Sequence, residues 1–573
     1  MQLQFLYALC LSSLLAPLAV FAGDSISTDL DTYGSGDSQG TPYQTYLSNA
    51  DVKPPQLQIN SNSSGTAPGY VFIGVDGKPT SGQNVPVIYD MSAERMGTLV
   101  WTGNYSEPFD FKVQTYKGEP VLTFWSGELL DGYGHGSYYI LNQSYVEIAH
   151  FSAVGYEDLG DLHEFTITTD DTALVTVYAV SQANLLEFGG LADGYIFDGV
   201  FQEIDIESGK VVFEWNSTEH VALNETYNDL GSSGTLDSPF DYFHINSVEK
   251  DADGNYLVSA RVMDCVYKID GKTGDIIWRL HGKRSDFDVE DAANFAFQHD
   301  ARWVDDKAQT RMTIFDNGPT DEVAYSRGLL LDVDQSAKTV RLNTEFANGA
   351  KTFAMYEGCL QPINASDEKT NYFLGFGNQP FFAELDADGK ILLDVQFGKT
   401  NAVNSYRAYK LPWTGKPLTS PDMYYDAGAK KAYLSWNGAT EVESWAIYTA
   451  NTTGANAEWL PLVNVTRTGF ETELDLSGVE GRLETYVRGK AANAAGHTIG
   501  WTRASNGTAM VDAPVPSSEA VVAQSSSSSV SATSTSSTTA TPSATKKSAA
   551  VRRCGFSELA ALVAAFTAML FVL

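Results

Sequence analysis

Hydrophobic and polar residues alternate in short runs along most of the chain, and turns that contain glycine separate these runs. Alternation over four to eight residues is typical of strands, and Asp-Gly between two such runs indicates a hairpin. Helical periodicity is scarce. Because several runs repeat strand, turn, strand and tryptophan, the pattern predicts the blades of a β-propeller around a central channel. The clearest repeats are FQEIDIESGKVVFEW (Phe201–Trp215), YLVSAR to DIIWRL (Tyr256–Leu280) and FFAEL to KILLDVQF (Phe381–Phe397).

The pattern changes near Pro417, where the alternating runs become longer. The segments Ala432–Ala450 and Glu484–Ala504 predict strands of a second domain, a small β-sandwich. Trp436 and Tyr486 resemble the core aromatics of an immunoglobulin or fibronectin-like module. We therefore predict an all-β chain with a propeller over residues 23–416 and a β-sandwich over residues 417–512.

Both ends of the chain predict the secretory pathway. Residues 1–22 are apolar and close on Val20-Phe21-Ala22, a pattern typical of a signal peptide. A Ser/Thr-rich stalk is predicted over 513–548, and residues 549–573 combine a polar stretch with an apolar tail, which indicates a GPI-anchor signal. A short C-terminal membrane segment is the alternative. We expect the outer face of the plasma membrane or the cell wall, with the membrane contacted through this anchor.

Glycosylation and cysteine chemistry follow from that location. Cys10 and Cys554 lie in the predicted leader and anchor signals, so Cys265 and Cys359 remain, either as a disulfide or as two separately buried thiols. Sequons for N-glycosylation occur at Asn62, Asn104, Asn142, Asn216, Asn224, Asn364, Asn451, Asn464 and Asn506.

The formal net charge of −34 excludes a chain that relies on a basic surface to bind nucleic acid. An anionic substrate must instead meet a local basic site. Asp251-Ala-Asp253-Gly and the same string at Asp386 begin like calcium loops, but both lack the later ligands, and we interpret them as turns. No metal and no cofactor is expected.

Histidines with polar neighbours are the candidates for chemistry. His244 and Asn246 stand at i and i+2 of a predicted strand and are expected to face one cavity. His299 follows Gln298, and Asn317 and Arg327 come soon after it. His163 is expected to be a core residue whose loss affects folding.

These motifs, in this order, resemble the arylsulfotransferase family, in particular its fungal branch. The matching strings are DLHEF, DYFHINSV, YLVSAR, GDIIWRLHGK, FQHDAR, FDNG and YSRG, and the resemblance covers about Tyr70 to Gly398. It implies a six-bladed propeller that transfers a sulfuryl group from an aryl sulfate to a phenol without a nucleotide donor. By motif matching, His244, His299 and Arg327 become candidate catalytic residues, and Asn246, Arg261, Gln298 and Asn317 candidate substrate-binding residues.

The sequence departs from the family at one position. The family's model enzymes use a further histidine in a later blade as nucleophile, but the corresponding segment, Gly375 to Glu384, contains none. Either His244 or His299 takes over as nucleophile, or the transfer is direct, or the reaction is a different one. Two alternatives to a sulfotransferase therefore stay open. One is a non-catalytic propeller that binds a wall glycan or a protein. The other is a glycan-processing enzyme, in which Asp241, Asp300 or Asp316 would form an acid/base pair. The substrate is expected to be a small aromatic or a glycan, and the oligomeric state stays unassigned.

The first prediction concerns the C-terminus. Removal of Leu559–Leu573 should release the protein into the medium, because the apolar tail is the signal for anchor attachment. The measurement is the distribution of protein between medium and membrane, with phospholipase treatment of the full-length chain as control. Membrane retention that resists both phospholipase and alkali would contradict the GPI interpretation and favour a spanning helix.

Overall fold

A computed structural model describes residues 20–22, 26–27, 42–77, 84–156, 158–318 and 323–515 of the chain. These residues fall within one compact unit, Met1–Val522. The predicted signal peptide before Val20, the stalk after Val515 and the anchor signal lie outside the described residues. No helix in the described part of the chain is long and apolar enough to cross a membrane.

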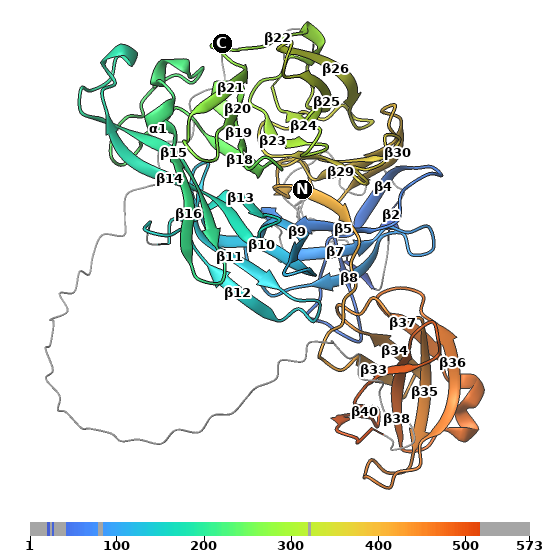
Figure 1. The fold of residues 1–573 in the computed structure, drawn as a ribbon. Coiled ribbons are helices and arrows are strands. Elements are labelled where there is room, and N and C mark those ends of the chain that lie inside the picture. The colour runs from blue at the N-terminus through green and yellow to red at the C-terminus, as the bar shows by residue number, and fades with distance from the viewer. Residues whose placement is uncertain are drawn as a thin grey trace, which may run out of the picture. The chain divides into compact units, whose positions relative to one another are not determined.

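The described chain is nearly all strand, as the period-two alternation predicts (Figure 1). Its helices are short: α1 (Ser217–His220), η1 (Leu186–Phe188), η2 (Leu223–Glu225), η3 (Arg261–Met263), η4 (Asp291–Ala293) and η5 (Ser477–Arg482). Both Asp-Ala-Asp-Gly strings form turns, with Gly254 and Gly389 in the left-handed conformation at φ 82° and 78°. Asp251 and Asp386 accept backbone N–H groups within their own turns, so no separate ligand is needed to explain these aspartates.

Antiparallel meanders make up most of the chain before residue 417. The first is β9 (Phe109–Tyr116), β10 (Glu119–Leu129), β11 (Gly134–Leu141) and β12 (Glu147–Phe151). The second is β13 (Asp161–Ile167), β14 (Thr172–Ala183), β15 (Gly194–Asp205) and β16 (Lys210–Asn216), with β17 (Phe240–Asp241) beside β15. The third is β18 (Ile245–Lys250), β19 (Tyr256–Ala260), β20 (Cys265–Ile269) and β21 (Ile276–His281). The fourth is β23 (His299–Trp303), β24 (Arg311–Asp316), β25 (Arg327–Asp334) and β26 (Thr339–Phe346), with β22 (Asp288–Val289) on β26.

Two further sheets join distant parts of the sequence. In one, β4 (Leu57–Asn62) pairs with β30 (Ile391–Gln396), which continues to β29 (Phe381–Leu385), β28 (Tyr372–Gly375) and β27 (Cys359–Pro362). In the other, β32 (Ala408–Leu411) pairs with β5 (Tyr70–Gly74), which continues to β7 (Pro86–Asp90) and β8 (Thr98–Thr102). Figure 1 shows the blue N-terminal strands beside the gold strands from the end of this region. The two ends of the region thus hold each other by backbone hydrogen bonds.

The remaining short pairings involve the N-terminal segments and one loop. They are β1 (Val20–Ala22) with β3 (Tyr43–Thr45), β2 (Ile26–Ser27) with β4, and β6 (Asp76–Gly77) with β31 (Val403–Asn404).

After residue 417 the strands form two sheets whose side chains share one hydrophobic cluster. Trp445 and Ile447 from one sheet and Leu434 from the other are fully or almost fully buried in this cluster. One sheet contains β33 (Asp422–Asp426), β34 (Lys431–Ser435) and β37 (Thr472–Asp475). The other contains β35 (Ser444–Ala450), β36 (Leu460–Thr466), β38 (Tyr486–Ala492), β39 (Thr498–Trp501), β40 (Ala504–Ser505) and β41 (Met510–Val511).

The first strands of the meanders lie together. β9 contacts β13, β13 contacts β18, β18 contacts β23, β23 contacts β27, and β32 contacts both β27 and β9. These contacts close a ring of first strands. The side chains that meet there are not all apolar, and a group of buried charges occupies this position.

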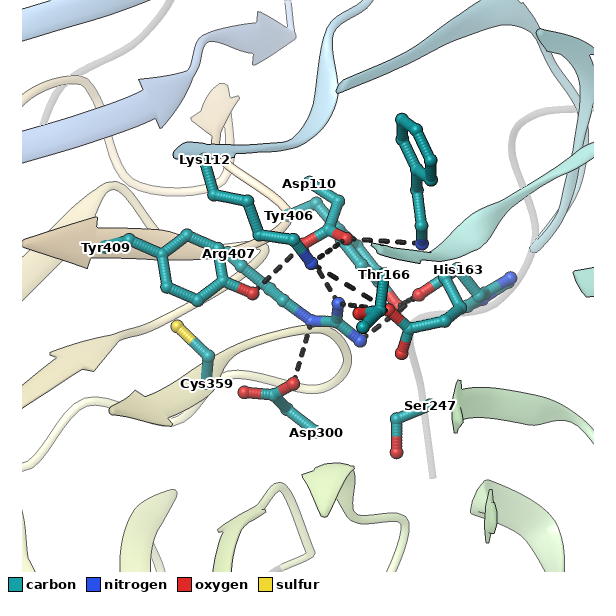
Figure 2. Close-up of polar contacts among 12 residues, drawn as sticks. Asp110, Lys112, His163, Thr166, Ser247, Asp300, Cys359, Tyr406, Arg407 and Tyr409 are labelled. Carbon is teal, nitrogen blue, oxygen red and sulfur yellow. Dashed lines mark hydrogen bonds and ion pairs between the residues drawn. The ribbon is translucent and has the colours of Figure 1, made fainter. Parts of the chain in front are cut away.

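Arg407, which directly precedes β32, is the hub of these charges and is fully buried (Figure 2). Its guanidinium lies 2.9 Å from Asp110 of β9 and 3.3 Å from Asp300 of β23. Lys112 lies 2.6 Å from Asp110, and Arg302 lies 2.9 Å from Asp300 and 2.5 Å from Glu164 of β13. Each of these buried charged side chains thus has an oppositely charged partner, either on another strand or on its own strand. A buried charge is tolerated in a protein core when it is paired in this way.

The glycosylation sites and the cysteines can also be located. None of the nine sequon asparagines is buried. Cys265 and Cys359 are free, buried thiols, so of the two alternatives the structure has separate thiols rather than a disulfide. The Cys359 thiol donates a 3.1 Å hydrogen bond to the carbonyl of Ala408, and burial raises its pKa to about 12.

The second prediction tests the buried charges. Arg407→Met should lower the free energy of unfolding by about 3–5 kcal/mol, because it leaves buried carboxylates without their cation. Denaturant unfolding measures this. Arg341→Met is the matched control, since Arg341 pairs with Asp288 at an exposed position, and it should cost about 0–1 kcal/mol. Equal losses in the two variants would contradict the role given to Arg407.

Candidate active site

Two Asp–His pairs lie close to the buried charges. The first is on β13, where His163 Nδ1 lies 2.7 Å from Asp161 Oδ2. Asp161 also accepts the backbone N–H groups of Gly134 and His163 and the Thr176 hydroxyl. Burial acts to raise the pKa of Asp161, but the charge and hydrogen bonds of His163, with the N–H of Gly134, outweigh it and lower this pKa. Asp161 is thus a buried carboxylate that fixes the orientation of the His163 ring.

In the second pair, Asp241 ends β17 and His244 lies three residues later. His244 Nδ1 lies 2.5 Å from Asp241 Oδ2, and the His244 side chain keeps only 11% of its exposure. Burial is the main cause that lowers the pKa of His244. Asp241 opposes it, while the nearby charges of His163 and Arg261 lower the pKa further. A neutral imidazole at ordinary pH is therefore the favoured form of His244.

His244 does not lie in a strand, because β18 begins one residue later at Ile245 and His244 has φ 53°. This left-handed conformation is uncommon for residues other than glycine and is found where the fold constrains a side chain. The expectation that His244 and Asn246 share a strand face therefore fails. Asn246 instead donates to the carbonyl of Gln298 at 2.6 Å, and its own Oδ1 has no partner in the described residues.

The two histidine rings meet edge to face. The centroids of His163 and His244 are 5.0 Å apart with an interplanar angle of 81°. Each ring has its Nδ1 bound to an aspartate, and for neither Nε2 does the described part of the chain supply a hydrogen-bond partner. Gly132 lies opposite, since a Cβ there would stand 4.0 Å from His244 Cε1. Two oriented imidazoles therefore present vacant nitrogens near one another.

His299 lies beside this pair, with its centroid 6.5 Å from that of His244, but both its nitrogens are occupied. Its Nδ1 lies 2.7 Å from Asn317 Oδ1, and its Nε2 accepts the backbone N–H of Glu357 at 3.2 Å. Asn317 uses its NH₂ group on the carbonyls of Ala354 and Glu357, so its oxygen must accept and Nδ1 must carry the proton. Burial, with the charges of Arg261 and His244, lowers the pKa of His299 well below its ordinary value.

Arg261 supplies the positive charge of the cluster. Its backbone N–H donates to the carbonyl of His244, and its guanidinium lies 4.9 Å from the ring centroid of Phe297 and donates to the carbonyl of Met355 at 3.1 Å. Its Nε is buried without a hydrogen-bond partner in the described residues. A cation with an unused donor beside two imidazoles is suited to hold an anion.

Arg327 forms ion pairs and hydrogen bonds with residues outside the histidine cluster. Its Nε lies 3.0 Å from Asp316 and its Nη1 2.7 Å from Glu345, and its Nη2 donates to the carbonyl of Asn294. None of the partners that the structure gives it is a histidine. Arg327 therefore joins β24, β25 and β26, and its charge is already balanced by two carboxylates.

The other candidate residues mostly bind backbone. Gln298 donates to the carbonyls of Ala260 and Cys265 and to the Ser259 hydroxyl, which fixes it between strands. The carboxylates considered for a glycan-processing enzyme are separated by their partners: Asp241 binds His244, Asp300 binds Arg302 and Arg407, and Asp316 binds Arg327. In the described residues no group of three or more His, Cys, Asp or Glu side chains is arranged to hold a metal ion.

Apolar side chains lie next to the cluster at two places, beside His163 and beside Arg261. Tyr178 stacks on His163 with centroids 5.2 Å apart, and Phe197 and Tyr133 contact Tyr178 in turn. The segment that binds Arg261 and His299 carries Met355 and Tyr356, which are 56% and 44% exposed. The cation Arg261 thus adjoins exposed apolar side chains, an arrangement suited to an aromatic anion.

Sequence reasoning missed the pair Asp161–His163. The signal was present, because Asp and His at i and i+2 of one strand project to the same face. The sequence does not show that the ring of His244 contacts the ring of His163.

The third prediction concerns His299. Its pKa in the folded protein lies below the ordinary value of 6.5, so the unfolded state binds this proton more readily. The stability that neutral His299 contributes is present above about pH 6.5 and decreases as the pH falls below that value. The difference in unfolding free energy between wild type and His299→Gln should therefore shrink from pH 7 to pH 5. A difference that stays constant or grows would contradict a neutral, buried His299.

Among solved structures, similar chains include a protein of unknown function from Bacteroides caccae with 12% identity, covering 60% of this chain and 99% of that chain at a TM-score of 0.34. Another is a catalytically inactive virginiamycin B lyase from Staphylococcus aureus with quinupristin, with 9% identity, covering 66% and 95% at a TM-score of 0.30. No curated protein matches. The model of the family described as arylsulfotransferase (ASST) matches residues 112–398, which include both Asp–His pairs, His299 and Arg261. The chain belongs to the arylsulfotransferase family.

Proposed function

We propose that this protein transfers a sulfuryl group from an aryl sulfate to a phenolic acceptor without a nucleotide donor. The observation that carries the proposal is the pair Asp241–His244 beside Arg261, whose Nε lacks a partner in the described residues. An aryl sulfate is an anion with an apolar ring, and the cluster combines a cation, imidazoles and neighbouring apolar side chains.

The chemistry assigns a role to each of these groups. Negative charge spreads over the sulfuryl oxygens in the transition state, as it does over phosphoryl oxygens, and Arg261 is placed to stabilise it. Neutral His244, oriented by Asp241, accepts the proton of the acceptor phenol through Nε2. His299 acts as a positioning residue, since its Nε2 holds the segment that carries Met355 and Glu357.

These roles differ from motif matching in two respects, since His299 becomes a positioning residue and a different arginine binds the anion. The anion-binding role passes from Arg327 to Arg261, because Arg327 is neutralised by Asp316 and Glu345. A cation in such a double ion pair would have to break one pair to bind a substrate anion. Asp241 and Asp264 interact with the charge of Arg261 electrostatically, without a direct ion pair. The Nε–H group of Arg261 therefore stays available for a ligand.

The same proposal covers the architecture and location. We propose that the ring of sheets is a six-bladed propeller, that residues 417–512 form an immunoglobulin or fibronectin-like sandwich, and that the protein is secreted, N-glycosylated and anchored at the cell surface by its C-terminus, as in the fungal branch of the family. The closed ring of first strands supports the propeller, and the absence of burial at all nine sequon asparagines supports N-glycosylation.

The fourth prediction tests the activity. Wild-type protein should convert 4-nitrophenyl sulfate to 4-nitrophenol when a phenol is present, and His244→Asn should lower kcat on the order of a hundredfold or more. Arg261→Met should lower kcat/KM on the order of a hundredfold, because it removes a donor that the developing charge needs.

Two variants serve as controls. His497→Asn changes an exposed histidine in the turn after β38 and should leave the rates unchanged. Arg327→Met should act mainly on stability, which thermal unfolding measures. Wild-type rates in His244→Asn, or a lack of transfer by the wild type to any phenol, would refute the proposed function.

A further inference from the structure

Two complete Asp–His pairs at one place are more than a single proton transfer needs. In each pair the aspartate holds Nδ1, and the described residues leave Nε2 without a partner. The rings are 5.0 Å apart between centroids and nearly perpendicular. A single transferred group could thus be approached by two imidazoles from different directions.

The second pair has no assigned role in the proposed function. Resting on that function, we propose that transfer is direct within one complex of donor and acceptor, with His244 as general base and His163 as general acid. A bond forms between the acceptor oxygen and sulfur, and the bond between sulfur and the donor oxygen breaks. The acceptor proton goes to His244 Nε2, and the proton on His163 Nε2 goes to the leaving phenolate.

The surroundings of the two rings support this division of roles. Asp161 accepts hydrogen bonds from Gly134, Thr176, and the backbone N–H and Nδ1 of His163, and because these contacts, with the charge of His163, outweigh burial and lower the pKa of Asp161, it is an ionised partner for the His163 ring. Asp241 is 27% exposed and its Oδ1 lacks a partner in the described residues, while the cation Arg261 lies on the side of His244. The acid and the base therefore differ by their environment rather than by residue type.

Other charged and titratable groups face these rings. They are Arg261 and His299 near His244, and Tyr178 and Tyr406 near His163. Burial raises the pKa of both tyrosines well above the ordinary value, so both remain neutral. After one turnover the proton has moved from His163 to His244, and exchange with solvent restores the starting state.

A covalent intermediate would have to form on one of the two imidazoles of these pairs. His299 offers no vacant nitrogen, and the segment from Gly375 to Glu384 contains no histidine. Direct transfer instead leaves both imidazoles for the two proton transfers. A direct transfer requires two aromatic molecules at once. Two apolar groups adjoin the cluster and are at least partly exposed: Tyr133, which stacks on buried Tyr178, and the pair Met355 and Tyr356. One ring can lie against each.

The fifth prediction separates a general acid from a structural histidine by the leaving group of the donor. His163→Gln should lower kcat on the order of a hundredfold with phenyl sulfate, whose phenolate needs a proton. With 4-nitrophenyl sulfate, whose phenolate leaves readily without one, the loss should be less than about tenfold. Tyr406→Phe is the matched control, because it removes one hydrogen bond to the His163 carbonyl and should affect both donors equally.

Initial rates of the wild type provide a test that does not depend on folding of the variant. With donor and acceptor both varied, double-reciprocal plots should intersect, and no labelled protein should form when donor labelled with radioactive sulfate is added alone. Parallel plots, a labelled histidine, or equal losses of His163→Gln on the two donors would overturn this inference and leave the proposed function standing. No transfer by the wild type would overturn both.

Discussion

The need to neutralise charge at the centre of the ring is the constraint on which the rest of the structure depends. Arg407 directly precedes β32, the last strand of the ring, and contacts Asp110 of β9 and Asp300 of β23. Burying a lone guanidinium costs several kcal/mol, so the three strands cannot separate without exposing or isolating these charges. Backbone pairing of β4 with β30 and of β5 with β32 also holds the two ends of this region together.

The same arginine connects the fold to the active site. Its Nη2 donates to the carbonyls of His163 and Asn246, at 3.1 and 2.9 Å, and these belong to the segments that carry His163 and His244. Figure 2 shows His163 and Arg407 within this group of buried charges. Glu164, next to His163, is held as a carboxylate because the charges of Arg302, Arg407 and Lys112 outweigh its burial and lower its pKa. His163 thus lies on a first strand, and His244 directly precedes another, which suits groups that must be held in register.

Much of the fold could be predicted from the sequence because it depends on local patterns. Strand alternation, Asp-Gly turns and the change of pattern near Pro417 predict the nearly all-β chain and its turns at Gly254 and Gly389. The site could be predicted only in part. Motif order brings His244 and His299 to one place, but the left-handed φ of His244 moves it out of the strand on which Asn246 lies. The sequence alone does not distinguish the roles of Arg327 and Arg261. Only their partners in the structure show that two carboxylates neutralise Arg327, whereas Nε of Arg261 has no hydrogen-bond partner in the described residues.

In the proposed mechanism Arg261, His244 and His163 together surround the transferred group. A crystal structure of the protein with an unreactive aryl sulfamate, in which nitrogen replaces the bridging oxygen of the donor, tests this arrangement. We expect sulfamate oxygens within hydrogen-bond distance of Arg261, and Nε2 of His163 near the bridging nitrogen. Binding of the anion at Arg327, with the two Asp–His pairs untouched, would contradict it.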